Sequence, residues 1–288
     1  MKLIAYQKGT DRMMARVQGN EVLPFASIED FWADPERGLL AAAQALSGGE
    51  SMAGLVQVPP LPDTARVLCA GLNYAAHAEE AHFKVPEHPD IFARWRSTLA
   101  VDGQAVPVPP REDHLDWEGE LAIIVGKELL DTTPEAAQAG FFGYACFNDL
   151  TARKFQMASD RWTLGKNTDS SGPLGPWIVT ADEIPNPDQL RIQTYVNGSG
   201  VQDGNTSNLI FLRRKTCRLR IGSDDAQTRR PHRYRHSGWH RGNPETTHVP
   251  ASRRYCRGRD RADRPHNQQD RPTLTLLGKS SFAPAGSA

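Results

Sequence analysis

Large aliphatic residues almost disappear from this chain after Phe211. Before that point, short apolar runs alternate with glycine- and proline-containing segments, a pattern typical of many short β-strands. Residues 213–288 have neither the two-residue apolar period of a strand nor the 3.6-residue period of a helix. Only the first 212 residues can therefore build a hydrophobic core.

A stiff connector divides this core-forming part in two. Pro59, Pro60 and Pro62 fix the backbone and remove hydrogen-bond donors. We expect residues 1–60 to form a small N-terminal α+β unit and residues 61–212 to form the main domain. In the first unit we predict two strands and then two helices, at 2–8, 12–19, 27–32 and 38–47.

The main domain is expected to contain more strands than helices. The apolar runs predict strands at 65–71, 92–95, 121–125, 141–147, 177–180 and 190–196. Helices are expected at 134–139, with Thr132 or Thr133 as the N-cap, and at 151–159. The fold class is therefore α+β, with a mixed, strand-rich sheet and not a doubly wound one.

Two glutamates precede the apolar run Leu121–Val125. Glu118 and Glu120 are two positions apart, so an extended strand would point both to one face. Two like charges held this close raise each other's pKa unless a cation neutralises them, and hard divalent cations prefer carboxylate ligands. Asp149, at the end of another strand, would supply a third carboxylate. Spacing alone leaves open a solvated pair of glutamates with Asp149 as a helix N-cap.

Two further patterns carry candidate chemistry. His77 and Glu80 share a helix face at i, i+3, and a carboxylate raises the basicity of an imidazole that acts as a general base. Lys166 lies in a glycine-flanked turn that could aim its ammonium at an anionic substrate. An exposed helical ion pair and a surface lysine are the respective alternatives. The phosphate-binding spacing GxxxxGK[ST] is absent from the sequence.

Five linked runs resemble the fumarylacetoacetate hydrolase family over residues 65–211: YAAHAEE, DWEGELAIIVGK, GYACFNDLTARKFQ, LGKNTDSSGPLGPWIVTADEI and VNGSGVQDGNTSNLIF. The resemblance implies a mixed β-roll of the family's C-terminal type, usually in a homodimer. It implies that a divalent metal is bound by Glu118, Glu120 and Asp149, with Mg²⁺ expected before Mn²⁺ or Ca²⁺. It further implies a base formed by His77 with Glu80, an active-site lysine at Lys166, and substrate contacts from Gln156 and Arg94.

The resemblance also implies a reaction class. Members act on acylpyruvates, diketo acids and related 2-oxo acids by hydrolysis, decarboxylation or isomerisation. We expect a metal-dependent hydrolase that cleaves a carbon–carbon bond of such a small molecule in aromatic or amino-acid catabolism. An isomerase or a decarboxylase is the alternative.

The charge distribution changes where the apolar residues disappear. Residues 1–212 carry 16 basic and 28 acidic residues, whereas residues 213–288 carry 18 and 6, and 16 of those 18 are arginine. A basic tail can bind nucleic acid. A shifted reading frame is the better explanation, because family members continue here with an xPGDLIxTGTPxGVG turn and closing strands.

The turn can be recovered from the tail by an offset of one nucleotide. Residues 224–237 can be re-read as MTLKPGDLIDTGT, and residues 237–265 as PAGIGAIPKPPTYLQAGDTVEVEIERIG. The offset fixes the first and third letters of each new codon and leaves only the middle letter free. The specific Gly, Pro, Thr and Asp residues of the turn can therefore be recovered only where their first letters are already correct. We predict that residues 213–288 are out of frame and disordered, that they do not bind nucleic acid, and that the chain as written is impaired.

The cysteines and the N-terminus bear on the compartment. Cys69, Cys146, Cys217 and Cys256 form no CxxC pair, which argues against a disulfide framework or a zinc site. The N-terminus lacks the apolar region of a signal peptide, and no run is long enough to span a bilayer. We therefore expect a cytoplasmic protein without a membrane partner.

Overall fold

The computed structural model describes residues 1–71, 73, 88–113, 115–129, 133–210 and 273–274. All of these belong to one compact unit. Nearly all of the tail predicted to be out of frame, residues 213–288, lies outside the described residues. Its predicted disorder therefore stays a prediction.

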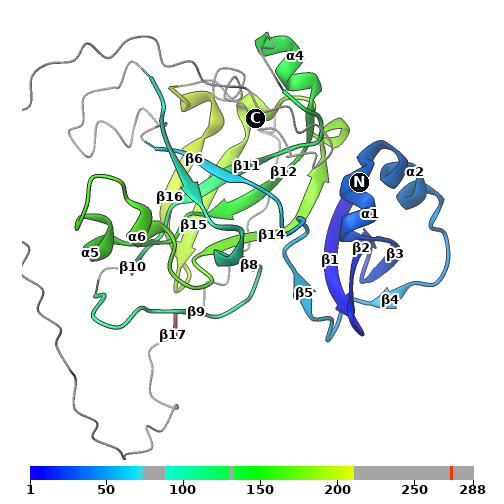
Figure 1. Cartoon of the computed structure of the whole chain (residues 1–288), viewed down its shortest axis with the longest axis horizontal. Coiled ribbons are helices and arrows are strands. Elements are labelled where there is room, and N and C mark those ends of the chain that lie inside the picture. The colour runs from blue at the N-terminus through cyan, green and yellow to red at the C-terminus, as the bar shows by residue number, and fades with distance from the viewer. Residues whose placement is uncertain (72, 74–87, 114, 130–132, 211–272, 275–288) are drawn as a thin grey trace, which may run out of the picture. The chain divides into compact units, whose positions relative to one another are not determined.

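Figure 1 shows short strands connected by few helices. The strands are β1 Lys2–Lys8, β2 Asp11–Gln18, β3 Glu21–Ser27, β4 Glu50–Ser51, β5 Gln57–Val58, β6 Val67–Gly71, β7 Asp90–Arg94, β8 Leu99–Val101, β9 Val106–Pro107, β10 Leu115–Asp116, β11 Gly119–Val125, β12 Phe141–Asn148, β13 Thr151–Ala152, β14 Gly172–Thr180, β15 Arg191–Val196, β16 Ser199–Asn205 and β17 Thr273–Leu274. The α-helices are α1 Ile28–Ala33, α2 Pro35–Gln44, α4 Pro134–Ala139, α5 Arg153–Gln156 and α6 Thr163–Lys166.

The largest sheet has nine described strands. Seven follow one another in the order β11-β12-β14-β1-β2-β3-β4, while β5 pairs with β1 and β8 pairs with β14. The β8–β14 pair is parallel and the other pairs of this sheet are antiparallel. The prediction of a strand-rich, mixed sheet is confirmed. Strand β1 is bonded to β14 across the boundary predicted at residue 60, and the division into units stays a prediction.

The central strands are buried because layers cover both of their faces. In β12, every residue from Phe141 to Ala145 is buried, which matches its continuous apolar run. Helix α1 covers part of the sheet through Phe31, whose ring packs edge-to-face on Phe142 with 5.5 Å between the ring centroids. Thr133 caps α4 by accepting a hydrogen bond from the backbone amide of Ala136. It is one of the two residues predicted for this role.

Local predictions differ from the structure at three places, and at two of them distant pairing overrode local preference. The helix expected at 151–159 is replaced by β13 and the short helix α5, since Thr151 and Ala152 pair with β10. Residues 172–176, which precede the strand predicted at 177–180, form the first half of β14 and pair with β8 and β12. Lys166 ends the short helix α6 and does not lie in a turn.

A buried tyrosine makes the sheet less stable at alkaline pH. Tyr6 is buried and donates a 2.9 Å hydrogen bond to Glu50 Oε1. Burial first, and then the bond to the Glu50 carboxylate, raise the pKa of Tyr6 from 10.0 to about 12. The protonated tyrosine is favoured in the folded state, so this contribution is complete below pH 10 and is lost as the pH rises towards 12.

We therefore expect the wild type to lose more stability than Tyr6→Phe between pH 9 and pH 12, by at most about 2.7 kcal/mol. Urea unfolding of both proteins at several pH values measures the difference. Parallel curves for the two proteins would contradict the assignment to Tyr6.

Within the described residues, no helix has both the length and the apolar character needed to cross a membrane.

Candidate metal centre

The pairing of β11 with β12 brings two carboxylate-bearing residues together. Gly119 lies opposite Asn148, so Glu118 precedes β11 at the end where Asp149 follows β12. The Asp149 amide donates a 2.9 Å hydrogen bond to the Glu118 carbonyl, and the Glu118 amide donates one of 2.9 Å to Asn148 Oδ1. One backbone bond and one bond to the Asn148 side chain therefore fix the positions of Glu118 and Asp149.

Three carboxylates converge at this point. One oxygen each from Glu118, Glu120 and Asp149 lies within 4.8 Å of the others. Asp149 is fully buried, and the two glutamates are half-buried. The sequence correctly predicted that these side chains gather, and three carboxylates are a donor set that suits a hard divalent cation. Their role as metal ligands stays a prediction.

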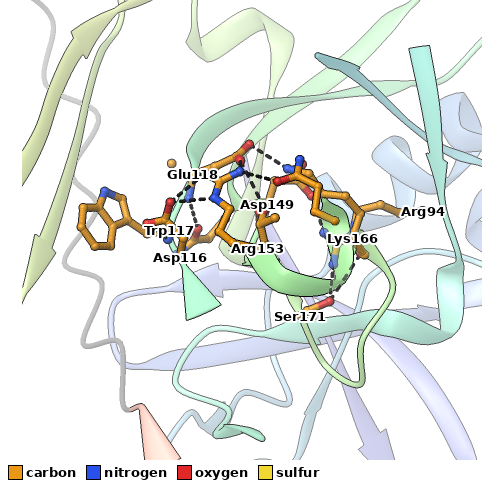
Figure 2. A network of polar contacts seen from close by, with 12 residues as sticks. Arg94, Asp116, Trp117, Glu118, Asp149, Arg153, Lys166 and Ser171 are labelled. Atoms are coloured by element: carbon orange, nitrogen blue, oxygen red, sulfur yellow. Dashed lines mark hydrogen bonds and ion pairs between the residues drawn. The ribbon is translucent and has the colours of Figure 1, made fainter. Parts of the chain in front are cut away.

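Two buried cations already neutralise part of this charge, as Figure 2 shows. Lys166 Nζ lies 2.8 Å from Glu118 Oε2 and 2.7 Å from Asp149 Oδ2. Burial lowers the pKa of Lys166, but Glu118 and Asp149 raise it further, so its net pKa is above the ordinary value. Arg94 pairs with the other oxygen of Asp149 and donates a second bond to Ser171 Oγ.

Arg153 supports Glu118 from the opposite side and was not predicted from the sequence. Its Nη1 lies 2.8 Å from Glu118 Oε1 and 2.9 Å from Gln156 Oε1. Its Nε and Nη2 contact Asp116 Oδ2 at 2.8 and 2.7 Å. In the sequence, Arg153 lies between Asp149 and Gln156, within one of the runs that carry the resemblance. This position was the signal that could have identified Arg153 as a site residue.

Glu120 is the carboxylate that lacks a cationic partner. Among the described residues, no ion pair or hydrogen bond reaches its side chain. Burial, followed by the charges of Asp149 and Glu118, raises the pKa of Glu120 well above its ordinary value. The site thus carries a carboxylate whose ionised form needs an additional positive charge, and a divalent cation fits this requirement.

The structure accounts for the other predicted site residues to different degrees. His77 and Glu80 lie outside the described residues. Gln156 is buried on α5 and bonded to Arg153. The Arg94 side chain is completely inaccessible and faces Asp149, so its predicted contact with substrate has no counterpart in this arrangement and stays a prediction.

Gly165 allows α6 to lie directly against α5. A Cβ atom at this position would lie 2.5 Å from the backbone nitrogen of Gln156 and 2.6 Å from the Cα atom of the same residue. We expect Gly165→Ala to lower the free energy of unfolding by about 1–3 kcal/mol, because the backbone of α5 must move. Urea unfolding measures this loss. Gly204→Ala is the control, since its added Cβ meets nothing within 4 Å, and equal losses in both variants would contradict the packing argument.

The model of the family described as fumarylacetoacetate (FAA) hydrolase C-terminal matches residues 66–216. The matched range contains all three carboxylates of the cluster, together with Lys166, Arg153 and Arg94. It ends near the point at which the apolar periodicity of the sequence stops.

Two curated relatives each match about half of the chain. An uncharacterized protein of Archaeoglobus fulgidus is 40% identical over 154 residues, 54% of this chain and 60% of the relative. The human mitochondrial oxaloacetate tautomerase is 37% identical over 154 residues, 53% of this chain and 49% of the relative. The chain thus spans about half the length of the curated relatives it matches.

A solved structure shares the fold. Maleylpyruvate hydrolase from Sphingobium, in complex with manganese(II) and pyruvate, superposes with a TM-score of 0.60 at 24% identity. The superposition covers 76% of this chain and 81% of that one. The two proteins therefore share a fold over this part of the chain.

Proposed function

Because this chain belongs to the fumarylacetoacetate hydrolase family, we propose that it is a metal-dependent hydrolase of the carbon–carbon bond in an acylpyruvate or related diketo acid. The observation that carries the proposal is the carboxylate cluster, in which Glu120 has no cationic partner among the described residues. The manganese and pyruvate of the Sphingobium hydrolase support a divalent metal and a 2-oxo acid as the bound species. Mg²⁺ remains the first expectation, with Mn²⁺ or Ca²⁺ as alternatives.

Each residue of the site has a separate task in this proposal. Glu118, Glu120 and Asp149 would hold the metal, which when bound supplies Lewis-acid stabilisation of negative charge on a 2-oxo acid. Lys166 keeps its proton, because its raised pKa favours the ammonium form, and so offers positive charge to an anionic substrate. Arg153 holds one oxygen of Glu118 and the amide of Gln156 in place.

The base of the reaction is the part that rests on resemblance alone. His77, with Glu80 beside it, is proposed to take a proton from the water that attacks the distal carbonyl of the substrate. Cleavage of the carbon–carbon bond then gives a carboxylic acid and pyruvate or a related 2-oxo acid.

A tautomerase is the second candidate, and the 37% identity to human oxaloacetate tautomerase favours it. This reaction moves a proton between carbon and oxygen of a 2-oxo acid and needs no attack by water. The same cluster of carboxylates and the same lysine would serve it, so the residues described here do not separate the two reactions.

The test is a panel of acylpyruvates and oxaloacetate, offered with and without Mg²⁺ or Mn²⁺. Loss of diketo-acid absorbance together with two products in the NMR spectrum identifies the hydrolase. Keto–enol exchange without cleavage identifies the tautomerase. Turnover that is unchanged after removal of metal by EDTA would contradict both versions.

The panel should include the chain as written and a version with the frame restored after codon 211. We expect the chain as written to be weakly active or inactive and the restored chain to be active, because the family's closing segment is recovered. DNA sequencing around codons 211–213 tests the shifted frame directly. Equal activity of both chains would contradict the predicted impairment.

Assembly and compartment remain proposals as well. We propose a homodimer for the frame-restored chain, which light scattering would test. The cytoplasm is the proposed compartment, because the cysteine spacing suggests no disulfide framework.

A further inference from the structure

A side chain from a distant hairpin is bonded to the residue between the two glutamates of the cluster. The side-chain amide of Gln202, on β16, accepts a 3.0 Å hydrogen bond from the Gly119 N–H and donates one of 2.8 Å to the Gly119 C=O. Gly119 lies between Glu118 and Glu120, so these two bonds hold the peptide units on both sides of it. One side chain thus restrains the backbone that links two of the three carboxylates.

The bonds from Gln202 reach the edge of β11 that faces away from β12. The Glu118 carbonyl accepts from the Asp149 amide on the β12 side, and this direction alternates along a strand. The N–H and C=O of Gly119 therefore point away from β12, as those of Leu121 do two residues later. Among the described residues, no strand pairs with β11 on this side, so Gln202 takes the place of a backbone partner at Gly119.

The absence of a side chain at Gly119 lets the hairpin reach this backbone. A Cβ atom there would overlap Thr194 Oγ1 and would lie 2.8 Å from Gln202 Oε1. Because neighbouring residues of a strand point to opposite faces, this is the face behind Glu118 and Glu120. Glycine also has the greatest backbone freedom of any residue, so the two glutamates that it joins gain most from an external restraint.

Thr194 fixes the orientation of the Gln202 amide. The two residues lie opposite each other on β15 and β16, and the Thr194 hydroxyl donates a 2.7 Å hydrogen bond to Gln202 Oε1. Oε1 thus accepts two hydrogen bonds, which leaves Nε2 as the donor to the Gly119 carbonyl. The amide therefore has one orientation in which all three of these bonds are made.

The hairpin that carries Gln202 is anchored at its base. Thr206, which is fully buried, accepts a 2.9 Å hydrogen bond from the Leu190 amide and donates one of 2.8 Å to the Pro187 carbonyl. The Thr206 amide donates a further bond of 2.9 Å to the Leu190 carbonyl. These bonds join the residues before β15 to the residue after β16. Gln202 is therefore held by a supported element of the fold.

We propose that Gln202 is a positioning residue for the metal centre and that Thr194 keeps it in its bonding orientation. The inference rests on the proposed role of the carboxylates as metal ligands. Two ionised glutamates repel each other, and a linking segment that was free to turn would let them separate. Holding Gly119 from behind keeps both glutamates on the side of Asp149, so less order has to be gained when a cation binds.

Gln202→Met tests this role in the full chain as written, because methionine has a similar size but makes neither bond to Gly119. We expect binding of Mn²⁺ to weaken about 10- to 100-fold in calorimetric titration. We also expect a broader EPR spectrum of the bound Mn²⁺, because the ligands are no longer held in one arrangement. Thermal melting in EDTA is recorded alongside. A purely structural contact would lower Tm but leave the Mn²⁺ affinity and the EPR spectrum unchanged.

Substitutions at Thr194 give a conservative comparison. Thr194→Ser keeps the hydroxyl and should bind Mn²⁺ as the wild type does. Thr194→Val keeps the branched shape without the hydroxyl and should lose affinity, by a smaller factor than Gln202→Met. Gln193→Met is the control for the hairpin, since Gln193 points to the other face of β15 and bonds to Asp203. It should leave the affinity for Mn²⁺ unchanged.

The possible failures can be told apart. Wild-type affinity in Gln202→Met, or equal affinities in Thr194→Ser and Thr194→Val, would overturn the positioning role and leave the proposed metal centre standing. If Gln202→Met does not fold, the comparison of the two Thr194 variants decides. A wild-type chain that bound no Mn²⁺ would overturn the metal centre itself, and this inference with it.

Discussion

Glu120→Gln is expected to weaken binding of Mn²⁺ or Mg²⁺ by at least about 100-fold and to leave the metal-free protein as stable as the wild type or more stable. Glutamine keeps the size of the side chain but removes the charge that a cation would need. In the metal-free protein that charge is a liability, because burial and the carboxylates of Asp149 and Glu118 raise the pKa of Glu120. Calorimetric titration with Mn²⁺ and thermal melting in EDTA measure the two effects.

The matched control for this variant is Asp116→Asn. Asp116 is a carboxylate close to the cluster in sequence, but it is paired with Arg153 and does not belong to the three converging carboxylates. We expect it to retain most of the metal affinity. If Glu120→Gln bound Mn²⁺ as tightly as the wild type, the metal centre would have to lie elsewhere.

Arg94→Leu is expected to lower the free energy of unfolding by about 3–5 kcal/mol. The side chains of Arg94 and Asp149 are both completely inaccessible to solvent, so the substitution leaves a buried carboxylate without one of its two cationic partners. Lys166 still contacts Asp149 and limits the loss to the lower part of this range. Urea unfolding at constant protein concentration measures the change.

A double variant tests the cause of this loss. Adding Asp149→Asn removes the buried charge, so Arg94→Leu with Asp149→Asn should cost less than the sum of the two single substitutions. Arg94→Lys, which keeps the charge but lacks the second donor to Ser171, should fall between the wild type and Arg94→Leu. Additive costs would show that Arg94 contributes through packing and not through its ion pair.

Local patterns predicted the strands that surround the metal centre. Leu121–Val125 and Phe141–Phe147 are apolar, β-branched or aromatic runs, and their predicted bounds differ from β11 and β12 by at most two residues. The same patterns did not show that Gly172–Pro176 would be a strand, because glycine and proline disfavour strands locally. Pairing with β8 and β12 overrides that preference.

Side-chain partners were harder to predict than strands. Spacing placed Glu118 and Glu120 on one face, but the spacing of residues gives no sign that Lys166 bonds carboxylates 48 and 17 positions away. Arg153 was missed for a related reason. Its bonds to Asp116 and Glu118 depend on the pairing of β10 with β13. No local periodicity of apolar residues in the sequence predicts this pairing.

The amide of Gln202 has a consequence for how any further strand would align with β11. Because it occupies both backbone groups of Gly119, hydrogen bonding along this edge starts at Leu121. A slip of one residue would turn every side chain of the incoming strand to the wrong face, and a slip of two towards Gly119 would compete with Gln202. This one side chain therefore selects the register of the edge.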